Sequence, residues 1–189
     1  ATTAWRRESL SPWGRCWCSL VIPGAPLPSL LFALVLLAAP PDEVFSGPQK
    51  GEKTPPFKVL DVSGPHAGKE FDYVSEWKGA PTLLCFIHEL TRPGAQLIRR
   101  LDAHGAQNKD ALRTIFVSLA ADVQESERRL PVQIKAIDWR CPVAISVDGK
   151  EGPGAYGLNK DVLLTVIAAR DNAVVGNWAI VSPNETDFP

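Results

Sequence analysis

The sequence predicts an α/β fold in which a central sheet is flanked by helices. Two short, nearly continuous apolar runs, at residues 81–88 and 113–119, are typical of strands covered on both faces, as in a parallel sheet. An amphipathic pattern follows the first run from Pro93 onward, and two apolar runs near the end surround a tight turn at residues 170–172. Strands that alternate with helices and close in a hairpin predict a sheet that is parallel in the middle and antiparallel at one edge.

The expected elements follow one another along the chain from residue 57. One helix is expected from Pro93, which suits a first helical turn, and a second over residues 124–135 with Leu130 and Ile134 facing inward. Strands are expected at residues 57–62, 69–73, 81–88, 113–119, 144–147, 163–169 and 173–180. We expect the strands at 82–88, 113–119 and 165–169 to be the central and most buried strands of the sheet.

Composition excludes several classes of protein. Among 189 residues, 20 Lys and Arg balance 21 Asp and Glu, so the chain lacks the basic surface that nucleic acid requires, and we expect no nucleic-acid partner. Hydrophobic residues make up 45%, enough for a core without metal or disulfide support. Cys16 and Cys18 resemble half of a metal site, but no second pair follows, so we expect neither a metal nor a cofactor.

The first fifty residues differ from the rest and predict a leader, residues 1–50. Arg6, Arg7 and Arg15 precede an apolar run at residues 29–39, the pattern of a secretory signal. As a helix this run is about 16 Å long, too short for a bilayer core of roughly 30 Å. We expect export, to the periplasm if the source is bacterial; a retained membrane anchor and a buried core helix are the alternatives.

The main domain is expected over residues 51–189. Residues 45–56, "FSGPQKGEKTPP", are rich in Pro, Gly and Lys and predict a linker into it. The sequence stops at "SPNETDFP", where Ser182 or Asn184 could cap a helix. We therefore expect a C-terminal helix that is missing from this chain.

Four segments give residues 51–181 a family resemblance. They are "GEKTPPFKVLDVSG", "GAPTLLCFIHELTRPGAQLIRRL", "AISVDGKEGPGAYGLN" and "LLTVIAARDNAVVGNWAI". In this order and spacing they resemble the thioredoxin-like superfamily in its redoxin branch, close to peroxiredoxins of the alkyl hydroperoxide reductase type and to membrane-tethered thiol–disulfide proteins. The resemblance implies a central sheet flanked by helices, with the reactive group at the N-terminus of the first helix.

The reactive cysteines of that family are absent from this sequence. Redox members open the helix with C-x-x-C, and aligning Pro93 on the proline of that motif puts Thr91 and Gly94 at the two cysteines, with Arg92 between. In the peroxidase members a threonine lies three residues before the peroxidatic cysteine. Aligning Thr91 on that threonine also puts Gly94 at the sulfur position. The family's cis-proline position here reads Leu163–Leu164–Thr165. Because a helix start stabilises thiolate and neither Thr nor Gly can supply one, we expect "TRPG" to be a redox-inactive relic in which Thr91 caps the helix.

Two other cysteines lie in the domain. Cys85, inside the apolar run 81–88, is expected to be a small buried residue. Cys141 follows Arg140 and is a weaker candidate for an activated, exposed thiol. The strand at 113–119 is expected to separate the two by about 10 Å, too far for a disulfide.

His88, Glu89 and Arg92 flank the vacant position and are candidates for ligand binding. The alternatives are ordinary polar residues at a strand end, or a small-anion site formed by Arg92 and the free N–H groups of the helix start.

Two functions from different classes remain open. The first is an exported, redox-inactive binding or scaffold module, with another protein as a possible partner and a possible membrane tether at residues 29–39. The second is a thiol–disulfide oxidoreductase or peroxiredoxin-like antioxidant that uses Cys141 or Cys85.

Overall fold

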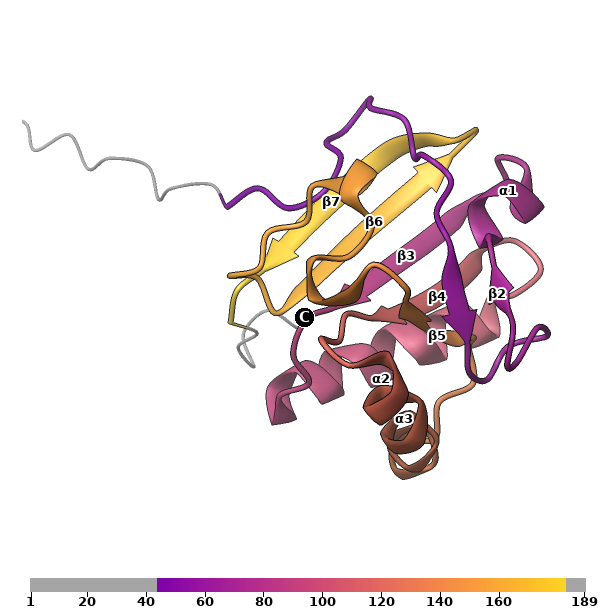
Figure 1. The fold of residues 1–189 in the computed structure, drawn as a ribbon. Coiled ribbons are helices and arrows are strands. Elements are labelled where there is room, and N and C mark those ends of the chain that lie inside the picture. The colour runs from indigo at the N-terminus through magenta and orange to yellow at the C-terminus, as the bar shows by residue number, and fades with distance from the viewer. Residues whose placement is uncertain (1–43, 183–189) are drawn as a thin grey trace, which may run out of the picture. The chain divides into compact units, whose positions relative to one another are not determined.

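The computed structural model describes residues 44–182 (Figure 1). The strands are β1 (Val59–Asp61), β2 (Glu70–Phe71), β3 (Thr82–Ile87), β4 (Arg113–Ser118), β5 (Val143–Ser146), β6 (Leu164–Arg170) and β7 (Ala173–Ile180). The helices are α1 (Tyr73–Trp77), α2 (Arg92–Gln107) and α3 (Val123–Ile137), with short 3-10 helices η1 (Gly149–Glu151) and η2 (Gly154–Tyr156). The apolar run at 29–39 and the expected C-terminal helix lie outside the described residues.

All the strands form one sheet, in the order β2-β1-β5-β4-β3-β6-β7. The middle strands β3, β4 and β5 are parallel, as expected, with Leu84 opposite Ile115 and Val117 opposite Ala144. The expectation of one antiparallel edge was wrong, because β1 and β2 add a second antiparallel edge beside β5. β6 and β7 form the expected hairpin next to β3, with left-handed backbone at Asp171 and Asn172 in its turn.

The sheet carries a core on each face, and each core has a different cover. α2 and α3 cover one face, where Ile98 and Leu130 are buried against Cys85 and Phe116. α1, η2 and the chain before β1 cover the other, where Phe57, Tyr73 and Tyr156 pack against Phe86. Burial on both faces explains why β3 is buried at every position and reads as a continuous apolar run.

Two segments differ from the sequence-based expectation. The strand expected at 69–73 ends at Phe71, because the Asp72 carboxylate accepts the N–H groups of Val74 and Ser75 at 3.0 and 3.1 Å and so begins α1.

The segment expected to be a linker, residues 45–56, is partly packed. The buried Ser46 hydroxyl bonds Thr165 Oγ1 at 2.6 Å, and the Asn177 amide donates to the carbonyls of Ser46 and Pro48. Gly51 N–H also donates to the carbonyl of Val174. These hydrogen bonds join the segment to β6 and β7, so it belongs to the domain.

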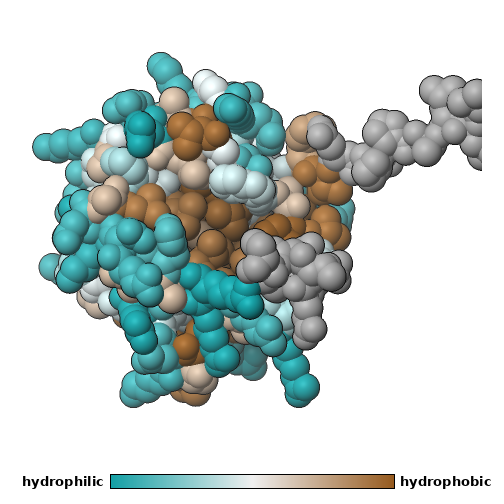
Figure 2. All heavy atoms as spheres, turned by 180° about the vertical axis from the view of Figure 1, so that it is seen from behind, coloured by the Kyte–Doolittle hydropathy of each residue, from teal (hydrophilic) through white to brown (hydrophobic). Residues whose placement is uncertain are grey.

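Hydrophobic residues gather near the centre of the rear face, with hydrophilic residues around them (Figure 2). Within residues 44–182 the exposed large apolar side chains are those of Val44, Phe45, Val132, Val175, Trp178 and Val181. All but Val132 lie on β7 or in the segments next to it, so the exposed large apolar side chains are concentrated at the β7 edge.

Candidate functional site

The "TRPG" loop begins α2 in the way that the sequence predicts. Thr91 is the N-cap residue, with extended backbone, and its Oγ1 accepts the N–H of Gly94 at 3.2 Å. Arg92 is the first helical residue and Pro93 the second, where a missing N–H costs nothing. The expected capping role of Thr91 is therefore confirmed.

Few backbone donors remain at this helix start for an anion. Pro93 has no N–H, and the N–H of Gly94 is already bonded to Thr91. Arg92 is exposed and does not line a cavity with His88 and Glu89. The threonine cap thus uses one of the donors that a small anion at Arg92 and the helix N-terminus would need, and that anion site stays a prediction.

Replacing Thr91 with alanine should lower the free energy of unfolding by about 1 kcal/mol, because the Gly94 N–H loses its acceptor. The measurement is the midpoint of urea unfolding, with the dependence of the free energy of unfolding on urea concentration unchanged between the two proteins. Thr91→Ser keeps a hydroxyl and is the control that should remain close to the wild type. Equal stability of the alanine and wild-type proteins would show that the cap contributes nothing.

His88 and Glu89 do meet in a cavity, which we call the strand-end cavity. It has a volume of 440 Å³ and lies at the carboxyl ends of the parallel strands, with residues 87–90 following β3 and residues 118–121 following β4. Lys150, from η1 after β5, and Arg129 of α3 complete its charged lining. Ligands of open α/β sheets bind at this edge, since loops from adjacent strands converge there.

The strand-end cavity contains buried nitrogen atoms that lack hydrogen-bond partners. Both ring nitrogens of His88 and the indole Nε1 of Trp139 are in this state among the described residues. Arg129 is paired with Glu125 at 2.5 Å, whereas Lys150 takes part in no ion pair among residues 44–182. Unpartnered buried donors cost stability unless a ligand or water satisfies them, so the cavity has unused binding capacity.

The pKa of His88 lies below its usual range because burial disfavours the charged imidazolium and Lys150 repels it. The unfolded chain therefore takes up a proton near pH 6.5 while folded His88 resists it, and the free energy of unfolding should fall as the pH drops below about 6.5. Lys150→Gln should raise the pKa of His88 and weaken this loss. NMR titration is simple because the chain has only 3 histidines. An unchanged pKa of His88 in Lys150→Gln would contradict the expected cause, and the control Lys160→Gln should leave that pKa as it is in the wild type.

The sequence pointed to His88 and Glu89 but missed Trp139 and Lys150. Both lie far from His88 and Glu89 along the chain and are brought into the same cavity by the parallel order of β3, β4 and β5. The predicted strand order could have indicated them, because the residues that follow parallel strands lie at the same edge of the sheet.

Cys85 and Cys141 are both free and buried. Cys85 has no exposed surface, and burial raises its thiol pKa far above the usual value. β4 lies between β3 and β5, as expected from the sequence. The prediction that Cys85 is a small core residue is confirmed.

The expectation of an exposed, activated Cys141 was wrong. Its side chain is 7% exposed, and burial together with the Asp102 carboxylate raises the pKa of its thiol to about 12. The Asp102 carboxylate accepts the Cys141 N–H at 2.8 Å, and the Cys141 thiol donates to the Asp102 carbonyl at 3.5 Å. Arg140 does not activate the thiol because its side chain pairs with Asp138 instead.

Leu163, where the family resemblance implies a cis-proline, lies beside the loop that follows β3. The carbonyl of Leu163 accepts the N–H groups of His88 and Glu89 at 2.9 and 3.5 Å. The chain therefore brings this segment beside the loop after β3, with Leu163 and Leu164 in place of proline.

Two further features are absent from residues 44–182. In this range no group of three or more His, Cys, Asp or Glu side chains is arranged to hold a metal ion. No helix in the same range has the length and hydrophobicity needed to cross a bilayer.

Comparison with known proteins gives matches in structure alone: no family model and no curated protein matches the sequence. A Chlorobium tepidum structure described as a "putative Thiol:disulfide interchange protein DsbE" has a TM-score of 0.57 and 19% identity over 74% of this chain and 89% of its own. A thiol peroxidase from Chromobacterium violaceum has a TM-score of 0.52 and 15% identity over 75% and 83%. A thiol:disulfide interchange protein from Bacteroides sp. has a TM-score of 0.51 and 16% identity over 68% and 80%. The described part of the chain therefore has the thioredoxin-like fold shared by redoxin and peroxiredoxin-like proteins.

Proposed function

We propose that this chain is a redox-inactive binding module built on the thioredoxin-like fold. The observation that carries the proposal is the start of α2, where Thr91 caps the helix through the N–H of Gly94, at the two positions where the family resemblance implies cysteines. Neither the hydroxyl of Thr91, which stays protonated, nor Gly94, which has no side chain, can act as the thiolate that disulfide exchange requires. The cysteines of the described domain offer no substitute, since burial raises both thiol pKa values.

The strand-end cavity is the binding site that we assign to this module. Its unpartnered nitrogens on His88 and Trp139 can bond a polar ligand, and Lys150 favours one with negative charge. Glu89 lines the same cavity and can accept a donor from that ligand. A small anion that also carries an N–H or O–H group fits this combination.

The experiment that tests redox inactivity is reduction of insulin disulfides by the full chain with dithiothreitol, alongside consumption of hydrogen peroxide. We expect rates equal to those without protein. The control is a variant with cysteines restored at positions 91 and 94, which shows that the assay can detect activity in this scaffold. Catalysis by the wild-type chain above background would overturn the proposal.

A second candidate, thiol-dependent oxidoreduction through Cys141, has one observation in its favour. Cys141 lines the other large cavity, so a substrate could approach it if the loop before β5 opened. This function requires a fast-reacting thiol, and activity that disappears in Cys141→Ser and persists in Cys85→Ser would establish it. Slow labelling of both thiols by a disulfide reagent under native conditions is the result that we expect.

We further propose that the module is exported, on the basis of the basic residues before the apolar run at 29–39. If the run is retained, it would tether the domain to the membrane, where another protein is a possible partner. Fractionation of a tagged chain tests this: recovery entirely in the cytosol would contradict export, and a cleaved form outside the cytosol would favour a signal peptide over an anchor.

A further inference from the structure

A second large cavity of the described domain lies at the opposite edge of the sheet from "TRPG", and we call it the strand-start cavity. Its volume is 760 Å³. Its wall is formed by residues at the amino ends of the parallel strands, with Ala80 before β3, Arg113 at the start of β4 and Pro142 before β5. β3 alone separates the two edges by about 20 Å, so this cavity is distinct from the strand-end cavity.

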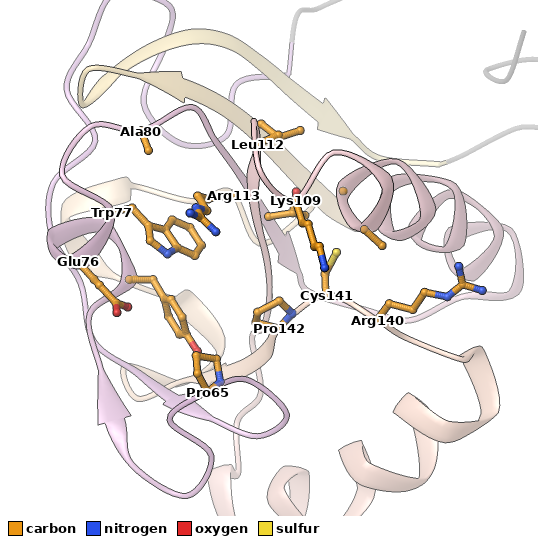
Figure 3. Close-up of a pocket in the computed structure, with 14 residues that line it drawn as sticks. Pro65, Glu76, Trp77, Ala80, Lys109, Leu112, Arg113, Arg140, Cys141 and Pro142 are labelled. Carbon is orange, nitrogen blue, oxygen red and sulfur yellow. The ribbon is translucent and has the colours of Figure 1, made fainter.

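Basic side chains dominate the charge of the strand-start cavity. Lys109, Arg113 and Arg140 line it, against a single acidic residue, Glu76. Glu76 is paired with His66 at 3.5 Å, and Arg140 with Asp138. Within residues 44–182 neither Lys109 nor Arg113 takes part in an ion pair. Figure 3 shows Trp77 and Arg113 on one wall and the Lys109 side chain directed into the cavity toward Cys141, whereas that of Arg140 points away.

The same cavity has an apolar surface suited to a flat group. Trp77 and Tyr73 of α1 lie with ring centroids 5.1 Å apart, and Leu112 and Pro142 face the cavity from other segments. An indole face beside cationic side chains can pack against an aromatic ring while the cations bind an acidic substituent.

A buried hydroxyl without a partner completes the site. Thr114 is 5% exposed, lines the cavity, and has no hydrogen bond to its Oγ1. Gly105 of α2 permits this packing, since a Cβ there would come within 2.6 Å of Thr114 Oγ1 and 3.0 Å of Cys141 Sγ. An unpartnered buried hydroxyl is costly in the empty protein, and a ligand oxygen would satisfy it.

We propose that the strand-start cavity binds a small aromatic anion, with its ring beside Trp77, its acidic group on Lys109 and Arg113, and an oxygen bonded to Thr114. The site is independent of the proposed function at the strand-end cavity, because the two share no lining residue. Cys141 does not oppose an anion there, since its thiol stays neutral at pH 7.

The test uses naphthalene-2-sulfonate with the full chain, followed by ¹H–¹⁵N NMR. We expect saturable shifts of the Trp77 indole N–H and of the Leu112 and Thr114 amides at millimolar concentration. Sulfate, which has the charge without the ring, and 2-naphthalenemethanol, which has the ring without the charge, should each bind at least about tenfold more weakly. Absence of saturation at about 10 mM, or equal binding of sulfate, would overturn the proposal.

Two variants separate a binding role from a structural one. Lys109→Gln combined with Arg113→Gln should weaken binding about tenfold, whereas the matched control, Lys160→Gln with Arg170→Gln, removes two exposed cations elsewhere and should leave it unchanged.

Thr114→Val should raise the melting temperature, because it removes an unsatisfied hydroxyl, and yet weaken binding several-fold. A merely structural threonine would change stability alone. Wild-type affinity in the double glutamine variant, or in Thr114→Val, would contradict the site.

Discussion

A Thr91→Cys, Gly94→Cys variant is expected to form a disulfide bond that dithiothreitol reduces, and to gain the insulin-reducing activity that we propose the wild type lacks. The geometry of the helix start favours this. A Cβ added at Gly94 would lie 3.0 Å from Thr91 Oγ1. Apart from the adjacent residues and the backbone of α2 itself, no other heavy atom would lie within 4 Å of it. In a disulfide, the Cβ of one cysteine lies about 3 Å from the sulfur of the other, given the S–S length and the tetrahedral angles at sulfur. The positions therefore already have the separation of a bonded pair.

The helix start should also activate the new thiol at position 91. A cysteine at an N-cap is stabilised as thiolate by the helix dipole, and Arg92 adds a nearby positive charge. The reduced variant should be about 1 kcal/mol less stable than the wild type because it loses the threonine cap.

Alkylation followed by peptide mass spectrometry tests the bond, and insulin turbidity tests the activity. Thr91→Cys and Gly94→Cys as single variants are the controls, since neither can close the loop. If the double variant remains folded by circular dichroism and forms no bridge under mild oxidant, then the loop has diverged from redox geometry.

Asp102→Ala is expected to cause the largest loss of stability among the substitutions considered, about 3 kcal/mol. Asp102 is 4% exposed, and its carboxylate accepts the N–H of Arg140 at 3.0 and 3.1 Å and that of Cys141 at 2.8 Å. Alanine would leave the buried N–H of Cys141 and the partly buried N–H of Arg140 without acceptors, which costs more than the loss of a surface hydrogen bond.

The same substitution should make Cys141 more reactive. Burial and, after it, the Asp102 carboxylate raise the pKa of the Cys141 thiol, and the bonds of that carboxylate hold the loop before β5 against α2. Removing it lowers that pKa and frees the loop, so a disulfide reagent should label Cys141 faster.

Urea unfolding and the labelling rate are the two measurements, with exposed Asp110→Ala as the matched control. Unchanged stability of Asp102→Ala would show that these bonds do not hold the loop, and unchanged labelling would show that the loop does not shield the thiol.

The order of strands and helices was largely determined by the local sequence. β3 and β4 follow directly from apolar runs, because a strand buried on both faces has no polar positions to interrupt it. α2 was determined equally well, since Thr91 and Pro93 are residues that favour a helix start. The absence of sulfur at positions 91 and 94 is a property of the sequence alone, and it is the basis of the proposed redox inactivity.

Tertiary structure decided what the sequence left open or suggested wrongly. Exposure of Cys141 depends on Asp102, which lies 39 residues away and folds the loop over the thiol. The packing of residues 46–54 depends on β6 and β7, more than a hundred residues later, because their side-chain and backbone partners exist only in the folded sheet. The strand-start cavity likewise joins α1, α2 and the amino ends of three strands. Cavities of this kind arise where distant segments fail to fill the space between them, and no local pattern of residues records that.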